Sequence, residues 1–205
     1  MHQETEQERV HRLQAESKLS NEGKKYFKFI EFDENEQLIT EIKKHPLGLF
    51  IIFATGAMIA VAMIFIGVFG SFADLGSMTG VSEVNQIGPI LSVLSLLLII
   101  GVVVATYIAS FLYTSNVIFV TNEKIAQVLY VSLFNKKISQ LSIGDVQDVT
   151  VTQKGILAHM FNYGTLVIET AGEQENYRFT YVPDPYQVSK LIVGSHEKNL
   201  VKYGN

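Results

Sequence analysis

The chain has no cysteine and no tryptophan among its 205 residues, and it has only four prolines. The absence of cysteine excludes disulfides, thiolate metal sites and cysteine catalysis. The formal net charge of −4 gives no basic footprint of the kind that binds nucleic acid. The length allows one soluble domain with a membrane anchor, or one larger domain.

Charge is also missing from two long apolar runs, residues 47–70 and residues 89–113. Each run exceeds the roughly 20 residues that a helix needs to cross a hydrocarbon core of ~30 Å. A pair of buried helices in a soluble protein is disfavoured, because the remaining chain is too short to cover both helices. The sequence therefore predicts a membrane protein with a transmembrane hairpin over residues 46–113. Small residues that would let the two helices approach closely are Gly56, Ala57, Ala60, Ala62, Gly101, Ala105 and Ala109.

Lysine and arginine are absent from the connection between the two runs, residues 71–88. Lys43 and Lys44 precede the first run, and further lysines follow the second. The positive-inside rule then predicts that both termini are cytoplasmic. The first run begins too late and is too long for the core of a cleaved signal peptide, so we expect an integral protein of the cytoplasmic membrane.

The polar leader, residues 1–45, has few apolar positions in its first part, residues 1–28. That composition favours a solvated helix or disorder, with a partner-binding helix as the alternative. Residues 26–32 (YFKFIEF) are aromatic and strand-prone, and predict a possible strand that could join the carboxy-terminal domain, or a segment on the membrane surface. Residues 33–46 suggest a short amphipathic run that leads into the membrane.

The pattern changes to period two at Asn116 and predicts a third part, a cytoplasmic domain over residues 114–205. About six short antiparallel strands are expected, followed by a helix capped by Asp184 with Pro185 at its first position. Residues 156–164 would form a short helical or irregular crossing. A sheet of this size must bury one face or close on itself, so a bent sheet or barrel is expected. The predicted strands are residues 116–121, 124–134, 138–143, 146–153, 165–171 and 176–182.

The alternating residues of this domain carry a resemblance to a known family. They are Ile138, Leu141, Ile143, Val146, Val149, Val151 and Gln153, followed by Met160, Phe161, Tyr163, Gly164, Leu166, Ile168, Thr170, Ala171 and Gly172. This pattern resembles the bacterial pleckstrin-homology (PH) domains of the second type. The resemblance implies a PH-like barrel, no catalytic activity, and a role as a membrane-associated interaction or scaffold module in the bacterial cytoplasmic membrane. Many members carry arginine in the first strand turn, where this chain has Asn122-Glu123-Lys124, so no anion contact is carried over to that turn.

The side chains that could do chemistry do not form a reactive pattern. The five histidines have no metal-ligand spacing. Asp145 and Asp148 suit a turn and a solvent face better than a pair of acid–base carboxylates. The sequence has no nucleophile elbow and no phosphate loop, and the apolar runs hold no ionisable residue of the kind used in ion-coupled transport. We therefore predict no catalytic residue, metal or cofactor.

Binding is the remaining class of function. Residues 114–205 hold eight basic and eight acidic residues, so no polybasic cluster is expected. Lys136, Lys137 and Lys154 are the candidates for a local contact with anionic lipid, although ordinary solvated lysines are the simpler interpretation. Met160 and Phe161 are the candidate contact surface, with core packing favoured for Phe161. The leading hypothesis is a membrane-anchored interaction or scaffold module that binds an unknown protein partner or a second copy. The alternatives are an accessory subunit of a membrane transport or enzyme complex, and an anionic-lipid-binding module.

Overall fold

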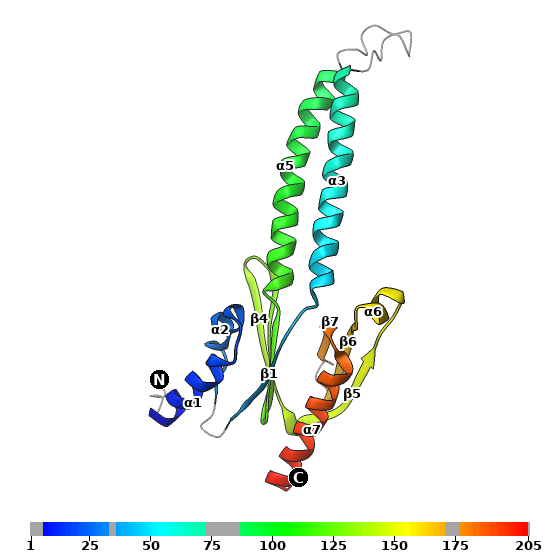
Figure 1. Cartoon of the computed structure of the whole chain (residues 1–205). Helices are drawn as coiled ribbons and strands as arrows, with labels where there is room; N and C mark the ends of the chain where they lie inside the picture. The colour runs from blue at the N-terminus through cyan, green and yellow to red at the C-terminus, as the bar shows by residue number, and fades with distance from the viewer. Residues whose placement is uncertain (1–5, 33–35, 73–86, 171–176, 205) are drawn as a thin grey trace. The chain divides into compact units, whose positions relative to one another are not determined.

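The computed structural model describes residues 6–32, 36–72, 87–170 and 177–204. The chain divides into two compact units (Figure 1). The first, which we call the β unit, comprises Met1–Pro46 and Leu112–Asn205. The second, the helical unit, comprises Leu47–Phe111. The elements of each unit are described separately below.

The helical unit is built from two apolar helices, α3 (Pro46–Phe72) and α5 (Ile87–Thr114), which lie side by side (Figure 1). Their bounds agree with the two apolar runs to within three residues. Glycine brings the helices together as expected at Gly56, where an added Cβ would lie 2.3 Å from Thr106 Oγ1. Gly101 was expected to contribute in the same way, but it has no neighbour within 4 Å of that position.

Serine side chains hold the other part of this helix pair, which the sequence pattern did not predict. Ser92 Oγ donates to the carbonyl oxygen of Gly67 at 2.9 Å. A Cβ added at Gly67 would lie 2.3 Å from Ser95 Oγ. Hydrogen bonds between helices of this kind are effective where no water competes for the donor. The approach of α3 to α5 therefore depends on small residues facing hydroxyl side chains.

The first sheet of the β unit has four antiparallel strands in the order β1-β2-β3-β4. They are β1 (Leu38–Lys43), β2 (Val117–Thr121), β3 (Lys124–Ser132) and β4 (Asn135–Ser142). The expectation of an amphipathic run over residues 33–46 was wrong for β1. Ile42 pairs with Ile118, and Lys43 with Val117, so backbone bonding to a distant strand determines the conformation of this segment.

The leader is folded where the structure describes it. It forms α1 (Glu6–Ser17) and α2 (Asn21–Phe27), so the possible strand over residues 26–32 was also wrong. Ser20 caps α2 by accepting a hydrogen bond from the Gly23 N–H at 3.0 Å. Tyr26 and Phe27 are buried by side-chain packing and not by strand pairing, whereas Phe29 is 40% exposed. Tyr26, Phe27 and Ile30 pack on one face of the first sheet.

The second sheet has the order β5-β6-β7 and is antiparallel. A 3-10 turn, η2 (Ile143–Asp145), leads into β5 (Val146–Thr152), and the short helix α6 (Ile156–Met160) connects β5 to β6 (Tyr163–Thr170). The last elements are β7 (Tyr177–Pro183) and α7 (Pro185–Tyr203). Asp184 occupies the expected cap position, but its backbone is left-handed at φ 43° and its side chain makes no capping bond.

Two hydrophobic cores lie on the two faces of the first sheet. One core joins Ile118, Val120 and Ile125 to β6, β7 and α7, and the other joins Val117, Phe119 and Val128 to the leader. All five residues of β2 are buried, because both faces of this strand are covered. The strands form two separate hydrogen-bonded sheets, so the expected barrel is not closed.

Candidate functional site

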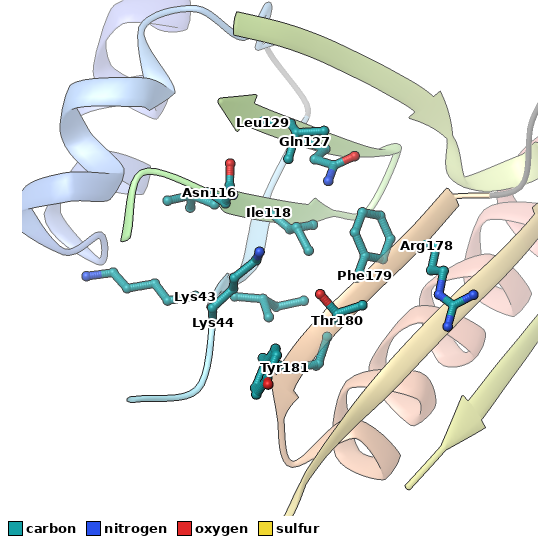
Figure 2. A pocket seen from close by; sticks show the side chains of 13 residues that line it. Lys43, Lys44, Asn116, Ile118, Gln127, Leu129, Arg178, Phe179, Thr180 and Tyr181 are labelled. Atoms are coloured by element: carbon teal, nitrogen blue, oxygen red, sulfur yellow. The ribbon is translucent and has the colours of Figure 1, made fainter. Parts of the chain in front are cut away.

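A cleft opens in the β unit where β1 and β7 face each other without forming a ladder (Figure 2). It encloses about 110 Å³, which is less than the roughly 300–1,000 Å³ of pockets for drug-sized ligands. The cleft therefore suits a side chain or a small polar group. Its lining residues are Ile42, Lys43, Lys44, Asn116, Val117, Ile118, Gln127, Leu129, Arg178, Phe179, Thr180, Tyr181 and Val182.

Lys44 is the cation most closely associated with this cleft. Its side chain points toward Ile118, whereas that of Lys43 points away from the cleft (Figure 2) and forms an ion pair with Glu22. Burial lowers the pKa of Lys44 from its ordinary value. The Lys44 ammonium also lies 5.1 Å from the centre of the Tyr113 ring, in a cation–π geometry. Among the described residues, those that line the cleft include no carboxylate or histidine, and Lys44 offers it a positive charge.

A second groove covers the outer face of the second sheet. Thr152, Thr165 and Thr180 present hydroxyl groups there, and Lys154 and Arg178 supply positive charge. Arg178, Thr180 and Tyr181 line both this groove and the cleft, so β7 forms the wall between them. The candidate lysine at position 154 is thus part of a mixed hydroxyl and cationic surface.

An aromatic cluster surrounds His45, immediately before the chain leaves the β unit. The His45 N–H donates to the Tyr181 carbonyl oxygen at 2.6 Å, and the Tyr113 hydroxyl donates to the His45 carbonyl oxygen at 2.7 Å. The His45 and Tyr163 rings have centroids 5.3 Å apart. Burial lowers the pKa of His45, against an opposing hydrogen bond with the Phe161 backbone. This cluster could not be predicted from the sequence, because its members are spread over three distant segments.

The structure places Met160 and Phe161 on the surface, with 70% and 45% of their area exposed. The favoured expectation that Phe161 packs in the core was therefore wrong. Phe161 follows α6, and this helix is too short to bury more than one position against the sheet. That position is taken by Ala158, which is 2% exposed.

The three candidate lysines come from different sheets. Lys136 and Lys137 begin β4, whereas Lys154 follows β5. The Lys136 ammonium lies 3.4 Å from the centre of the Phe29 ring, so this side chain already has an aromatic partner. Lys137 and Lys154 are exposed.

Exposed apolar residues that were not among the candidates lie beside these lysines. Val131 near the end of β3 is 57% exposed, and Leu133 and Phe134 in the β3–β4 connection are 42% and 99% exposed. Ile156 and Leu157 of α6 are 79% and 49% exposed. A signal was present in the sequence, because Leu133 and Phe134 immediately precede Asn135, a typical turn residue, and two lysines.

Asp148 and His159 were expected to have no reactive role. Asp148 Oδ1 accepts a hydrogen bond from the Val149 N–H at 2.8 Å, and His159 is exposed on α6. Within the described ranges, no group of three or more histidine, aspartate or glutamate side chains could hold a metal ion. The observed contacts of Asp148 are local hydrogen bonds on the exposed side of β5.

Two antiparallel sheets followed by a carboxy-terminal helix are consistent with a PH-like fold. The bacterial PH domain family matches residues 47–194, and the chain belongs to this family. Such domains are generally non-catalytic interaction modules. The matched range leaves out α1, α2 and β1.

A solved structure gives a further likeness. It is the crystal structure of a DUF1696 family protein with a pleckstrin-homology domain from Shewanella loihica PV-4. The two chains share 16% identity, over 40% of this chain and 70% of that one, with a TM-score of 0.32. None of the curated proteins compared with the chain matches it.

Proposed function

We propose that the protein is a membrane-anchored PH-like interaction module, which α3 and α5 hold at the cytoplasmic face of the bacterial membrane, and that it carries out no catalysis. Its three parts are the leader, the transmembrane hairpin and the carboxy-terminal domain. The leader and the carboxy-terminal domain act together, because β1 completes the first sheet.

The observation that carries this proposal is the exposure of the two apolar helices. Each is long and apolar enough to cross a bilayer, and only 6% and 11% of their most apolar windows are buried. A core helix of a soluble protein would instead be covered on most of its sides. Lipid is a suitable surrounding for uncharged helices that expose large apolar side chains. Phe65, Leu97 and Val103 are 71%, 60% and 60% exposed.

The charge distribution supports a cytoplasmic position for the β unit. Lys43 and Lys44 precede α3, Lys124 follows α5, and the connection between the helices has no lysine or arginine. The positive-inside rule assigns the lysine-bearing side to the cytoplasm. Tethering there raises the effective concentration of the module for membrane-proximal partners.

The contact surfaces of the module are of two kinds. The strands β4 and β5 are edges of their sheets and have backbone groups available for a protein partner or a second copy. Met160 and Phe161 form a separate, apolar contact surface. Lys154 is exposed beside Ile156 and Leu157 of α6, which favours a contribution of anionic lipid at that second surface. Lys137 is exposed beside the apolar residues Leu133 and Phe134 of the β3–β4 connection.

Labelling of single cysteines tests the topology, because the chain has no cysteine of its own. We expect Ser82→Cys to react with a membrane-impermeant maleimide in intact spheroplasts, and Lys198→Cys to react only after the membrane is opened. Equal reaction of both variants in intact spheroplasts would refute the topology. For the interaction role, cross-linking in native membranes is expected to give a stoichiometric partner or a homo-oligomer, whereas a clean monomer would refute it.

A further inference from the structure

We propose that two apolar tips of the β unit insert into the lipid interface of the same bilayer that α3 and α5 cross. One is the hairpin tip, formed by Val131, Leu133 and Phe134. The other is the α6 patch, formed by Ile156, Leu157, Met160 and Phe161. This inference rests on the proposed membrane anchoring, and it names lipid as what the second contact surface meets.

The hairpin tip has side chains that its turn does not require. Ser132 pairs with Asn135, so Leu133 and Phe134 alone form the connection between β3 and β4. Two-residue hairpin turns favour asparagine, aspartate and glycine for their backbone conformation. Here the turn instead presents a phenylalanine with 99% of its area exposed. A large aromatic ring held in this way lacks any packing role within the described part of the β unit.

The α6 patch reverses the usual burial of a helix. Its small residue, Ala158, is 2% exposed and faces the unit, while Ile156 and Met160 are 79% and 70% exposed. Elsewhere in the β unit, isoleucine fills the cores, as at Ile125 and Ile143. A helix that buries alanine and presents larger apolar side chains outward is suited to an apolar medium outside the protein.

Both tips lie at the end of the β unit where the chain leaves for the apolar helices. The chain leaves at Pro46 and returns at Leu112. His45, the residue before Pro46, hydrogen-bonds with the Phe161 backbone and contacts the Tyr163 ring, so the α6 patch is fastened at this exit. Tyr113, just after the return, donates its hydroxyl hydrogen to the His45 carbonyl oxygen.

The hairpin tip extends beyond the same end. The Tyr130 N–H donates to Asn116 Oδ1 at 2.7 Å, which places Tyr130 of β3 beside the residue that precedes β2. Residues 131–134 therefore continue past the point where the chain enters the first sheet. The opposite end of β2 and β3 contains Glu123, which bonds to Lys202 and Tyr203 at the end of α7.

A positively charged residue lies next to each of the two apolar tips, as in a segment that binds at the lipid interface. Lys137 follows the hairpin tip, Lys154 precedes the α6 patch, and both are exposed. Lysine next to apolar side chains places the ammonium among anionic headgroups while the apolar groups reach about 5–10 Å into the headgroup and acyl boundary. At Pro46 and Leu112 the chain of this end continues directly into the two helices proposed to cross the bilayer, so this continuity favours lipid over a protein as the occupant.

Single-cysteine fluorophores on the full-length protein test the inference. Four variants carry an environment-sensitive label: Phe134→Cys at the hairpin tip, Met160→Cys on α6, Leu97→Cys within α5, and Val201→Cys as the matched control. Val201 is apolar and 88% exposed, like the tips, but it lies near the Glu123 end. Each variant is reconstituted in vesicles of phosphatidylcholine and phosphatidylglycerol that contain lipids with a quencher near the headgroup or deep in the acyl chain. Circular dichroism checks that all four variants are folded.

We expect shallow quencher to remove most of the emission at positions 134 and 160, deep quencher to remove it at position 97, and neither to act at position 201. If position 97 is quenched while positions 134 and 160 behave like position 201, the interfacial insertion is wrong and the anchoring stands. If position 97 is not quenched, the anchoring fails and the insertion fails with it. Shielding of positions 134 and 160 in native membranes, but not in vesicles of the purified protein, would assign these tips to a protein partner and would overturn the inference.

Discussion

Glu41 on β1 binds Ser20, the capping residue of α2, through both oxygens of its carboxylate. Oε2 accepts from the Ser20 N–H at 2.8 Å, and Oε1 accepts from the Ser20 hydroxyl at 2.6 Å. The same hydroxyl accepts from the Gly23 N–H. A Cβ at Gly23 would lie 2.6 Å from this carboxylate, so the close approach requires glycine. Glu41 thereby links α2 to the first sheet, in addition to the packing of Tyr26, Phe27 and Ile30 on that sheet.

Glu41→Ala is expected to loosen the leader. The substitution leaves the Ser20 donors without their acceptor, and such losses cost about 1–3 kcal/mol when the groups are buried. We expect a lower urea midpoint for the full chain in detergent and faster proteolysis within the leader. Ser17→Ala is the control, because the Ser17 hydroxyl donates only to Gln14 on an exposed face. Equal proteolysis of the two variants would contradict the fastening role of Glu41.

The buried ion pair between Glu36 and Lys124 predicts an asymmetry between single and double substitutions. Glu36 Oε2 lies 2.9 Å from Lys124 Nζ, and the side chains are 0% and 14% exposed. Removal of one partner of a buried pair costs about 3–5 kcal/mol, since the other charge loses its ion-pair partner while it stays out of water. We expect that cost from Lys124→Met alone, measured as the free energy of unfolding. Adding Glu36→Leu should recover most of it, and a double variant as unstable as the single one would contradict this account.

His45 predicts a dependence of stability on pH. Burial keeps the pKa of His45 in the folded protein below its ordinary value of roughly 6.5. The unfolded chain therefore binds more protons near that pH, and the contribution of neutral His45 is fully present above about 6.5. This contribution to the free energy of unfolding is lost as the pH falls from about 6.5 through the lower pKa that His45 has in the folded protein. Unfolding of wild type and His45→Gln between about pH 7.5 and pH 5 measures it, and the variant should show the flatter profile over that range.

Substitution of Gly67 and substitution of Gly101 in the helix pair are expected to differ in their effect on stability. Gly67→Leu should disrupt the packing of α3 on α5, because even a Cβ at this position would lie 2.3 Å from Ser95 Oγ. Gly101→Leu is the matched control, since nothing lies within 4 Å of its added Cβ. Overpacking typically costs about 1–3 kcal/mol. We expect a lower thermal midpoint in detergent for the first variant alone, and equal midpoints would show that the close approach is not needed.

The carboxy-terminal strands and α7 could be predicted because their signals are local. Alternation of apolar residues, turn residues between them, and Pro185 after Asp184 all act within a few positions of the chain. These strands start and end within three residues of those expected at every boundary. The two apolar helices could be predicted equally well. A run of more than 20 residues without charge identifies such a helix whatever the rest of the fold is.

The leader and β1 could not be predicted, because distant partners determine them. Ile39 and Ile42 suit either a helical face or a strand, and β1 is a strand because β2 supplies its hydrogen bonds. Tyr26 and Phe27 have high strand propensity, yet both lie in a helix. Their rings pack on Val117 and Phe119. Propensity is a weak prior when burial against another element is available.

For the candidate contact residues, too, one feature could be predicted from the sequence and another depends on tertiary packing. The sequence indicated Met160 and Phe161 as one unit but favoured the core for Phe161, since a phenylalanine among apolar neighbours is usually buried. Only the packing of α6, which presents Ala158 to the sheet, decides that the larger residues are outside.

By itself, the sequence determined the two apolar helices, the antiparallel strands that follow them, the terminal helix and the family to which they belong. These features depend on the composition and spacing of neighbouring residues. The tertiary structure decided that the leader belongs to the folded unit, that the strands form two sheets instead of a closed barrel, and that apolar side chains gather where the chain leaves for the helices. The physical reason is that hydrogen bonding between strands and burial of side chains depend on residues far apart in the chain.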